Sequence, residues 1–149
     1  MIKVALLRPA DESILKSLRP LAEVLEKAID QEGSVVASNE HQAWWGCFAM
    51  ALMNYRDGKL GQARAWVERC ISSNKLSEVR SCSIEILLAM IESRSGNLQL
   101  AQACLSKASD QVVKKTGTLV EFGGDEQGYW HTWVIARILL KEAAAMINQ

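Results

Sequence analysis

The chain has 149 residues, of which 49% are apolar, and its 17 basic residues balance its 17 acidic ones. A chain of this length buries roughly 70% of its extended surface on folding, so neither disulfides nor metals are needed to hold a core. Zero net charge argues against nucleic acid or an anionic membrane as partner, because both attract a basic surface. We therefore expect a single domain over residues 1–149.

The composition favours helices. Both prolines lie before position 21, and Ala, Leu, Glu, Lys, Arg and Gln are abundant. The most apolar stretch, from Ala43 to Met53, has 11 residues, whereas a membrane span needs about 20. Asn39, followed three residues later by Gln42, has the pattern of a helix N-terminal cap. In chain order, we expect an all-α protein of about six helices, at about 11–31, 40–56, 59–72, 77–95, 98–114 and 128–147, with a turn in the loop 116–127.

An internal repeat connects the four central helices. A shift of 38 residues places residues 50–65 on residues 88–103. Gly58 and Gly96 each follow an apolar helix, where a left-handed glycine can end that helix and reverse the chain. The alternative is a chance similarity between two helical hairpins. Six pairs of positions are identical: Ala51/Ala89, Arg56/Arg94, Gly58/Gly96, Leu60/Leu98, Ala63/Ala101 and Ala65/Ala103.

This register resembles the tetratricopeptide repeat, a helix-turn-helix unit with small residues on both helices and a glycine near the turn. The resemblance implies an α-α superhelix, a right-handed stack of helix pairs. Its repeats would be residues 40–72 and 77–114, preceded by a degenerate half-repeat at 11–31 and closed by a capping helix at 128–147. The 38-residue period exceeds the usual 34, and the loop 72–77 can absorb the difference.

Four longer segments resemble a second family. The resemblance is to the helical-repeat region C-terminal to the kinase domain in bacterial serine/threonine protein kinases of the planctomycete and verrucomicrobial type, and it implies a protein-interaction appendage. The kinase itself is not expected, because the chain has no glycine-rich loop after a strand, no His-Arg-Asp and no Asp-Phe-Gly. The segments are KVALLRPAD, ALMNYRDGKLGQARAWVERC, LLAMIESRSGNLQLAQACL and YWHTWVIARILLKEAAAMI.

The tetratricopeptide resemblance places a candidate partner-binding groove on the inner face of the first helix of each repeat. Aromatic side chains beside arginine are frequent anchors of interfaces. We expect Tyr55, Arg56 and Arg94 at the surface, whereas Phe48, Leu52, Ile86 and Met90 could instead pack against the terminal helices. The candidate groove residues are Trp45, Phe48, Leu52, Tyr55, Arg56, Ile86, Met90 and Arg94.

No catalytic or metal-binding set is predicted. The two histidines lie 90 residues apart, and the four cysteines are spaced by 23, 12 and 22 residues, with no close pair of the kind that zinc fingers use. We expect reduced, buried thiols in a cytoplasmic protein without metal or cofactor. The sequence therefore predicts a non-catalytic scaffold that binds a protein or peptide, and the second resemblance implies that it is the partner-binding region of a bacterial signalling kinase. The alternative is a homo-oligomer in which another copy fills the apolar groove.

Overall fold

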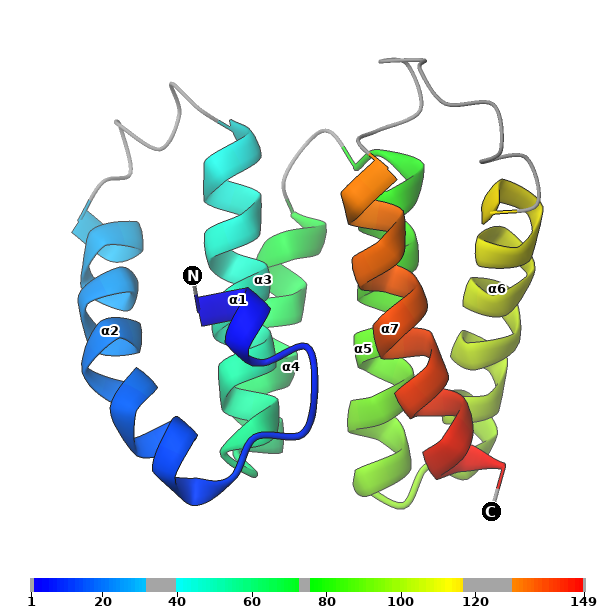
Figure 1. Ribbon diagram of the computed structural model, residues 1–149, viewed down its shortest axis with the longest axis horizontal. Helices are drawn as coiled ribbons and strands as arrows, with labels where there is room; N and C mark the ends of the chain where they lie inside the picture. Colours follow the sequence, from blue (N-terminus) through cyan, green and yellow to red (C-terminus); the bar gives the residue numbers. More distant parts are fainter. Residues whose placement is uncertain (1, 32–39, 73–75, 117–129, 149) are drawn as a thin grey trace. The chain divides into compact units, whose positions relative to one another are not determined.

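A computed structural model describes residues 2–31, 40–72, 76–116 and 130–148. Over these ranges the protein is all-α, with seven helices and no strand (Figure 1). Six helices lie where the sequence predicts them, and the short α1 is additional. The Asn39 cap and residues 117–127 of the predicted loop lie outside the described residues. The helices are α1 (Ile2–Ala5), α2 (Glu12–Gln31), α3 (Glu40–Arg56), α4 (Leu60–Ile71), α5 (Glu78–Arg94), α6 (Leu98–Thr116) and α7 (Trp130–Ile147).

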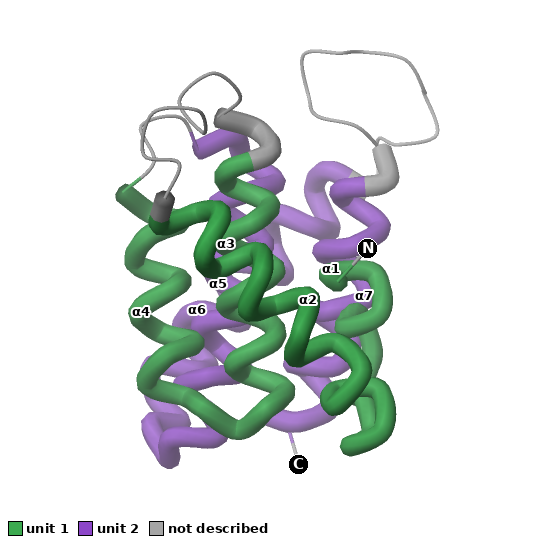
Figure 2. The backbone as a smooth tube through the Cα atoms, turned by 90° about the vertical axis from the view of Figure 1, so that its left-hand side faces the viewer, with its two compact units in different colours: residues 1–74 green, residues 75–149 purple. Residues whose placement is uncertain are grey.

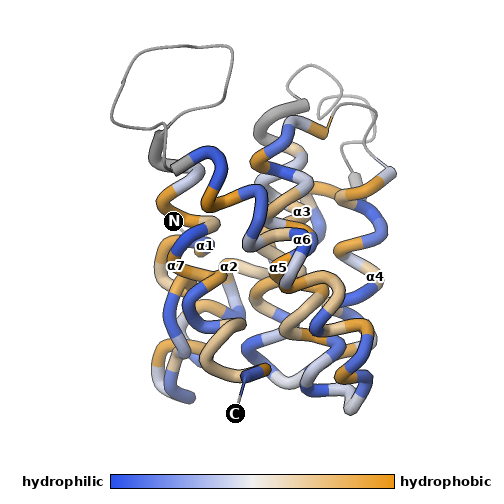
Figure 3. The backbone as a smooth tube through the Cα atoms, turned by 90° about the vertical axis from the view of Figure 1, so that its right-hand side faces the viewer, coloured by the Kyte–Doolittle hydropathy of each residue, from blue (hydrophilic) through white to orange (hydrophobic). Residues whose placement is uncertain are grey.

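The chain divides into two compact units. Residues 1–74 hold α1 to α4, and residues 75–149 hold α5 to α7 (Figure 2). Apolar and polar residues alternate along the outer helices, such as α2 and α4, as expected of helices with one buried face (Figure 3), whereas α3 and α5 are buried on more than one side. The candidate groove residues are therefore divided between the units, and each part is considered within its own unit.

The predicted glycine turn is present in the first unit. Gly58 has a φ of 75°, in the left-handed region that residues with a Cβ seldom adopt. Its N–H donates to the Tyr55 carbonyl at 3.1 Å, and the Lys59 N–H donates to the Asn54 carbonyl at 2.9 Å. These two bonds form a Schellman motif, which ends α3 and reverses the chain into α4.

The second unit contains the same turn, 38 residues later. Gly96 has a φ of 85°, and its N–H donates to the Ser93 carbonyl at 3.1 Å. The Asn97 N–H donates to the Glu92 carbonyl at 2.9 Å. Every donor and acceptor is therefore shifted by the period that the sequence predicts, and both units contain a helix, a left-handed glycine and a second helix.

Small residues allow the helices of each hairpin to approach closely. Ala51 and Ala63 are fully buried where α3 packs against α4, and Ala89 and Ala101 are fully buried where α5 packs against α6. Within the first unit, α2 also packs against α3. A Cβ at Gly46 would lie 3.3 Å from Cδ1 of Ile29, so this glycine permits the close contact.

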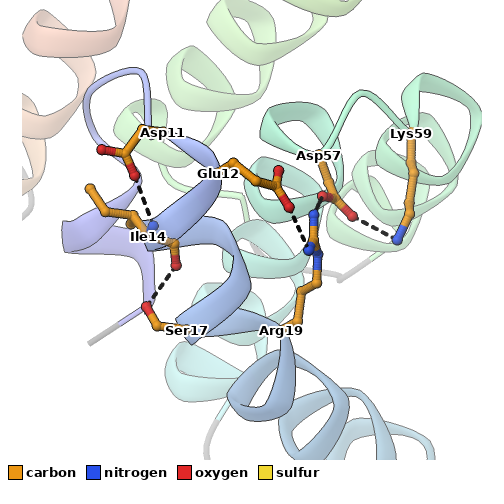
Figure 4. A network of polar contacts seen from close by, with 7 residues as sticks. All are labelled: Asp11, Glu12, Ile14, Ser17, Arg19, Asp57 and Lys59. Atoms are coloured by element: carbon orange, nitrogen blue, oxygen red, sulfur yellow. Dashed lines mark hydrogen bonds and ion pairs between the residues drawn. The ribbon is translucent and has the colours of Figure 1, made fainter.

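An ion-pair network joins α2 to the turn between α3 and α4 (Figure 4). The Asp57 carboxylate pairs with Arg19 Nη2 and with Lys59 Nζ, each at 2.7 Å, and only 8% of its side chain is exposed. Arg19 also bonds Glu12 at 2.8 Å. The hydrogen bonds from Arg19 and Lys59 hold the pKa of Asp57 below its ordinary value of 3.8.

In the second unit, α7 packs against both α5 and α6. Trp133, Leu139 and Ala143 provide its buried face. Arg137 and Lys141 of the same helix are exposed. Two salt bridges join α5 to α6: Lys107 pairs with Glu85, and Lys115 with Glu78.

Candidate functional site

The candidate face of α3 is covered by the beginning of the chain. We define residues 2–7 as the N-terminal segment, of which α1 forms one turn. This turn packs against α3 and against α2 (Figure 1). Leu6 is fully buried and Ile2 is nearly so, whereas Val4 is 62% exposed. The segment therefore inserts two aliphatic side chains into the first unit and directs another to solvent.

Arg56 holds the backbone of this segment. Its Nε and Nη2 atoms both donate to the Leu6 carbonyl oxygen, at 3.1 and 3.0 Å. A rigid planar guanidinium that places two donors on one acceptor gives a charge-assisted, orientation-specific contact. Arg56 is half-buried, so its charge is partly removed from water and this contact partly compensates for that loss.

Trp45 holds the other end of the N-terminal segment. The Lys3 ammonium lies 3.3 Å from the centroid of the Trp45 ring. Burial lowers the pKa of Lys3 from its ordinary value. Trp45 itself meets Phe48 edge to face, with ring centroids 5.9 Å apart. Lys3 therefore makes a cation-π contact with a ring that itself packs against Phe48.

The structure corrects the prediction for Tyr55. We expect this residue at the surface from the sequence, but its exposed fraction is only 2%. Phe48, Leu52 and Tyr55 are spaced by four and three residues, so they lie on one helical stripe. Phe48 and Leu52 are fully buried, and Tyr55 is buried with them. The apolar stripe of α3 therefore extends one turn further than the hydroxyl group suggests.

The second unit contains the remaining candidates. Ile86 and Met90 are fully buried, and α7 packs against α5, which agrees with the alternative that these residues face a terminal helix. Arg94, at the end of α5, is exposed as predicted. The equivalent residue Arg56 is half-buried and bonded to Leu6, so the repeated arginines have different surroundings.

A second concave site lies within this unit, between α6 and α7. It is a groove of about 640 Å³, and no sequence motif predicts it. Charged, hydroxyl and aliphatic side chains line the groove together. They are Gln102, Leu105, Ser106, Ser109, Asp110, Val112 and Val113 of α6, and Arg137, Leu140, Lys141, Ala144 and Asn148 from α7 and its end.

None of the four cysteines is disulfide-bonded; Cys70, Cys82 and Cys104 are buried as predicted, whereas Cys47 is half-buried. Burial raises the pKa of Cys70 and brings the pKa values of Cys82 and Cys104 to about 11. These groups therefore remain protonated at neutral pH, and a protonated thiol is a poor nucleophile. Among the described residues, His, Cys, Asp and Glu side chains do not gather in groups of three or more that could hold a metal.

Comparison of the chain with protein-family models finds no match, and comparisons with curated proteins and with solved structures find none either. None of the helices in the described ranges is long and apolar enough to cross a membrane. The function is therefore inferred from the two surfaces described above.

Proposed function

We propose that the chain is a non-catalytic, tetratricopeptide-like module that binds a short peptide segment on α3, and that its own N-terminal segment occupies this face. The observation that carries the proposal is the contact set of residues 2–7. Two aliphatic side chains are buried, a backbone carbonyl accepts two bonds from Arg56, and a lysine lies over Trp45. These are the means by which peptide-binding grooves hold a ligand.

Two features support the tetratricopeptide-like arrangement. The helix-glycine-helix unit recurs with the same Schellman turn and the same buried alanines. In addition, α7 packs against both helices of the hairpin before it, as the first helix of a following repeat does in a solenoid. The right-handed stack and the link to bacterial signalling kinases remain predictions.

The N-terminal segment indicates what kind of peptide fits. Its pattern is an aliphatic residue, then lysine, then leucine three positions later, represented by Ile2, Lys3 and Leu6. A partner segment with this pattern could make the same contacts with Trp45 and Arg56. None of the four cysteines is disulfide-bonded, which favours a reducing compartment, and we propose that the module is cytoplasmic.

Peptide exchange tests this function. The probe is a fluorescent, N-acetylated peptide of residues 1–10, titrated into the full chain. In the wild type, the tethered segment competes at a high effective concentration, so the added peptide should bind weakly. Leu6→Asp places a charge in a buried site and should release the segment, raising the affinity for the probe by at least about tenfold. Val4→Asp, at an exposed position, is the matched control and should behave as the wild type.

Two further variants make the result decisive. Leu6→Ala releases the segment by losing apolar contacts alone, and it should also strengthen probe binding if the Leu6→Asp chain fails to fold. Adding Arg56→Ala to either variant should abolish the gain, because the carbonyl of the probe loses both donors. If the probe binds none of these chains while their helicity is unchanged, the face of α3 is not a peptide site. Dimerisation of the released variants without probe would instead favour exchange of the segment between two copies.

A further inference from the structure

We propose that the groove between α6 and α7 is a second, independent docking site, and that it receives an amphipathic helix with acidic flanks from a partner protein. The site lies entirely within the second unit. It shares no residue with the face of α3, so this inference and the proposed peptide site can fail separately.

The length of the groove fits a helix. Its lining residues extend from Gln102 to Val113 along α6 and from Arg137 to Asn148 along α7 and its end. At 1.5 Å per residue, each wall is roughly 17 Å long, or about three helical turns. Ser106, Ser109 and Ala144 have short side chains, which leave room for a third helix between the first two.

Aliphatic side chains line the part of the groove that the side chains of a partner helix would enter. Leu105 and Val112 are largely buried among the lining residues, Leu140 is half-buried, and Val113 is 66% exposed. Covering this exposed valine with a partner would stabilise the complex by about 25 cal/mol for each Å² of apolar surface removed from water. Aliphatic groups at helical spacing on the partner would supply that cover.

An extended peptide would fit this groove poorly. Both walls are helices, whose backbone N–H and C=O groups are already bonded within the helix. They offer no row of free backbone groups to pair with an incoming strand, and the backbone of an extended segment would have to bond to water instead. The backbone N–H and C=O groups of a partner helix are already bonded within that helix, so it needs only side-chain contacts from the walls.

The basic side chains of the groove favour acidic residues on the flanks of the partner helix. Arg137 and Lys141 lie one turn apart on α7, and both are exposed. Asp110 is the one carboxylate among the lining residues, so cations outnumber anions by two to one. Carboxylates one turn apart on a partner helix would face the two cations, whereas lysines at the same places would be repelled. The groove therefore fits an acidic amphipathic helix.

Two blocked synthetic peptides provide the probe. Each has about 15 residues, with leucine at every third or fourth position; one has glutamates on its flanks and the other has lysines. We expect the full wild-type chain to bind the glutamate peptide at least about tenfold more tightly. The double variant Arg137→Glu with Lys141→Glu should invert this preference. The matched control, Lys16→Glu with Lys27→Glu, makes the same charge change at exposed positions of α2 and should leave the preference unchanged.

A steric variant separates docking from general charge effects. Ser106→Trp fills the groove from an exposed position and should abolish binding of the glutamate peptide. Ala103→Trp adds the same side chain at an exposed position of α6 that does not line the groove, and binding should persist. Failure of both peptides to bind, equal affinity for the two, or displacement of both by a fatty acid would each overturn the proposal.

Discussion

The alanine at the contact between the helices of each hairpin provides the sharpest test of the packing. Ala101 is fully buried where α6 meets α5, while Ala103, two residues later on the same helix, is exposed. Ala101→Leu and Ala103→Leu therefore add the same three carbon atoms to the same helix, one inside the contact and one in water. Both substitutions keep good helix formers, so helix propensity changes little.

The expected difference follows from this contrast. Inserting methylene groups into a packed interface costs typically 1–3 kcal/mol, so we take about 2 kcal/mol for Ala101→Leu. With a urea dependence of about 2 kcal/mol per M, its unfolding midpoint should fall by about 1 M. Ala103→Leu should change the free energy of unfolding by less than about 0.5 kcal/mol.

The first unit contains an equivalent pair of alanines, so the same comparison can be made there. Ala63 is fully buried between α3 and α4, and Ala65 is exposed. Ala63→Leu should lower the midpoint as Ala101→Leu does, and Ala65→Leu should have little effect. Urea titrations followed by circular dichroism measure all four variants. Equal midpoints for the buried and exposed members of either pair would refute the close helix contact that we derive from the buried alanines.

Three further predictions follow from the described contacts. Gly96→Ala should destabilise the fold by about 1 kcal/mol, because its φ of 85° disfavours a Cβ although no atom lies within 4 Å. Gly61→Ala, inside α4, should stabilise the fold by about 0.5 kcal/mol in the same urea titrations. Asp57→Asn should lower the free energy of unfolding by about 1 kcal/mol at neutral pH. Because Arg19 lowers the pKa of Asp57 below 3.8, this difference in stability between the wild type and the variant should be complete above about pH 3.8. It should disappear as the pH falls through the lowered pKa. The native chain should alkylate slowly at Cys82 at neutral pH, since burial raises the pKa of this thiol to about 11; mass spectrometry showing rapid labelling of the folded protein would contradict its burial.

Periodicity and glycine spacing predicted the repeated hairpins because they act locally. Gly58 and Gly96 determine how each first helix ends, and the buried alanines follow at fixed distances along the second helix. Helix positions were therefore predictable to within one or two residues. These signals need only neighbouring residues in the chain, which a single sequence contains.

The two surfaces depend on contacts between residues far apart in the chain. The helix α1 has only four residues, too few to show a period, and its position depends on Arg56 and Trp45 about 50 and 40 residues away. The apolar run at the start of the sequence was its only signal. The groove beside Ser106 arises from short side chains on two packed helices, and no motif marks such a space.

The position of Lys3 tests the central claim most directly. The claim is that residues 2–7 lie on α3 as an intramolecular ligand, with the Lys3 ammonium 3.3 Å from the centroid of the Trp45 ring. Protons above an aromatic face are shielded, so the side-chain methylene signals of Lys3 should move upfield in the proton NMR spectrum. In Trp45→Leu they should return to the positions seen in a free peptide of residues 1–10. Lys3 signals at the free-peptide positions in the folded wild type would contradict the claim.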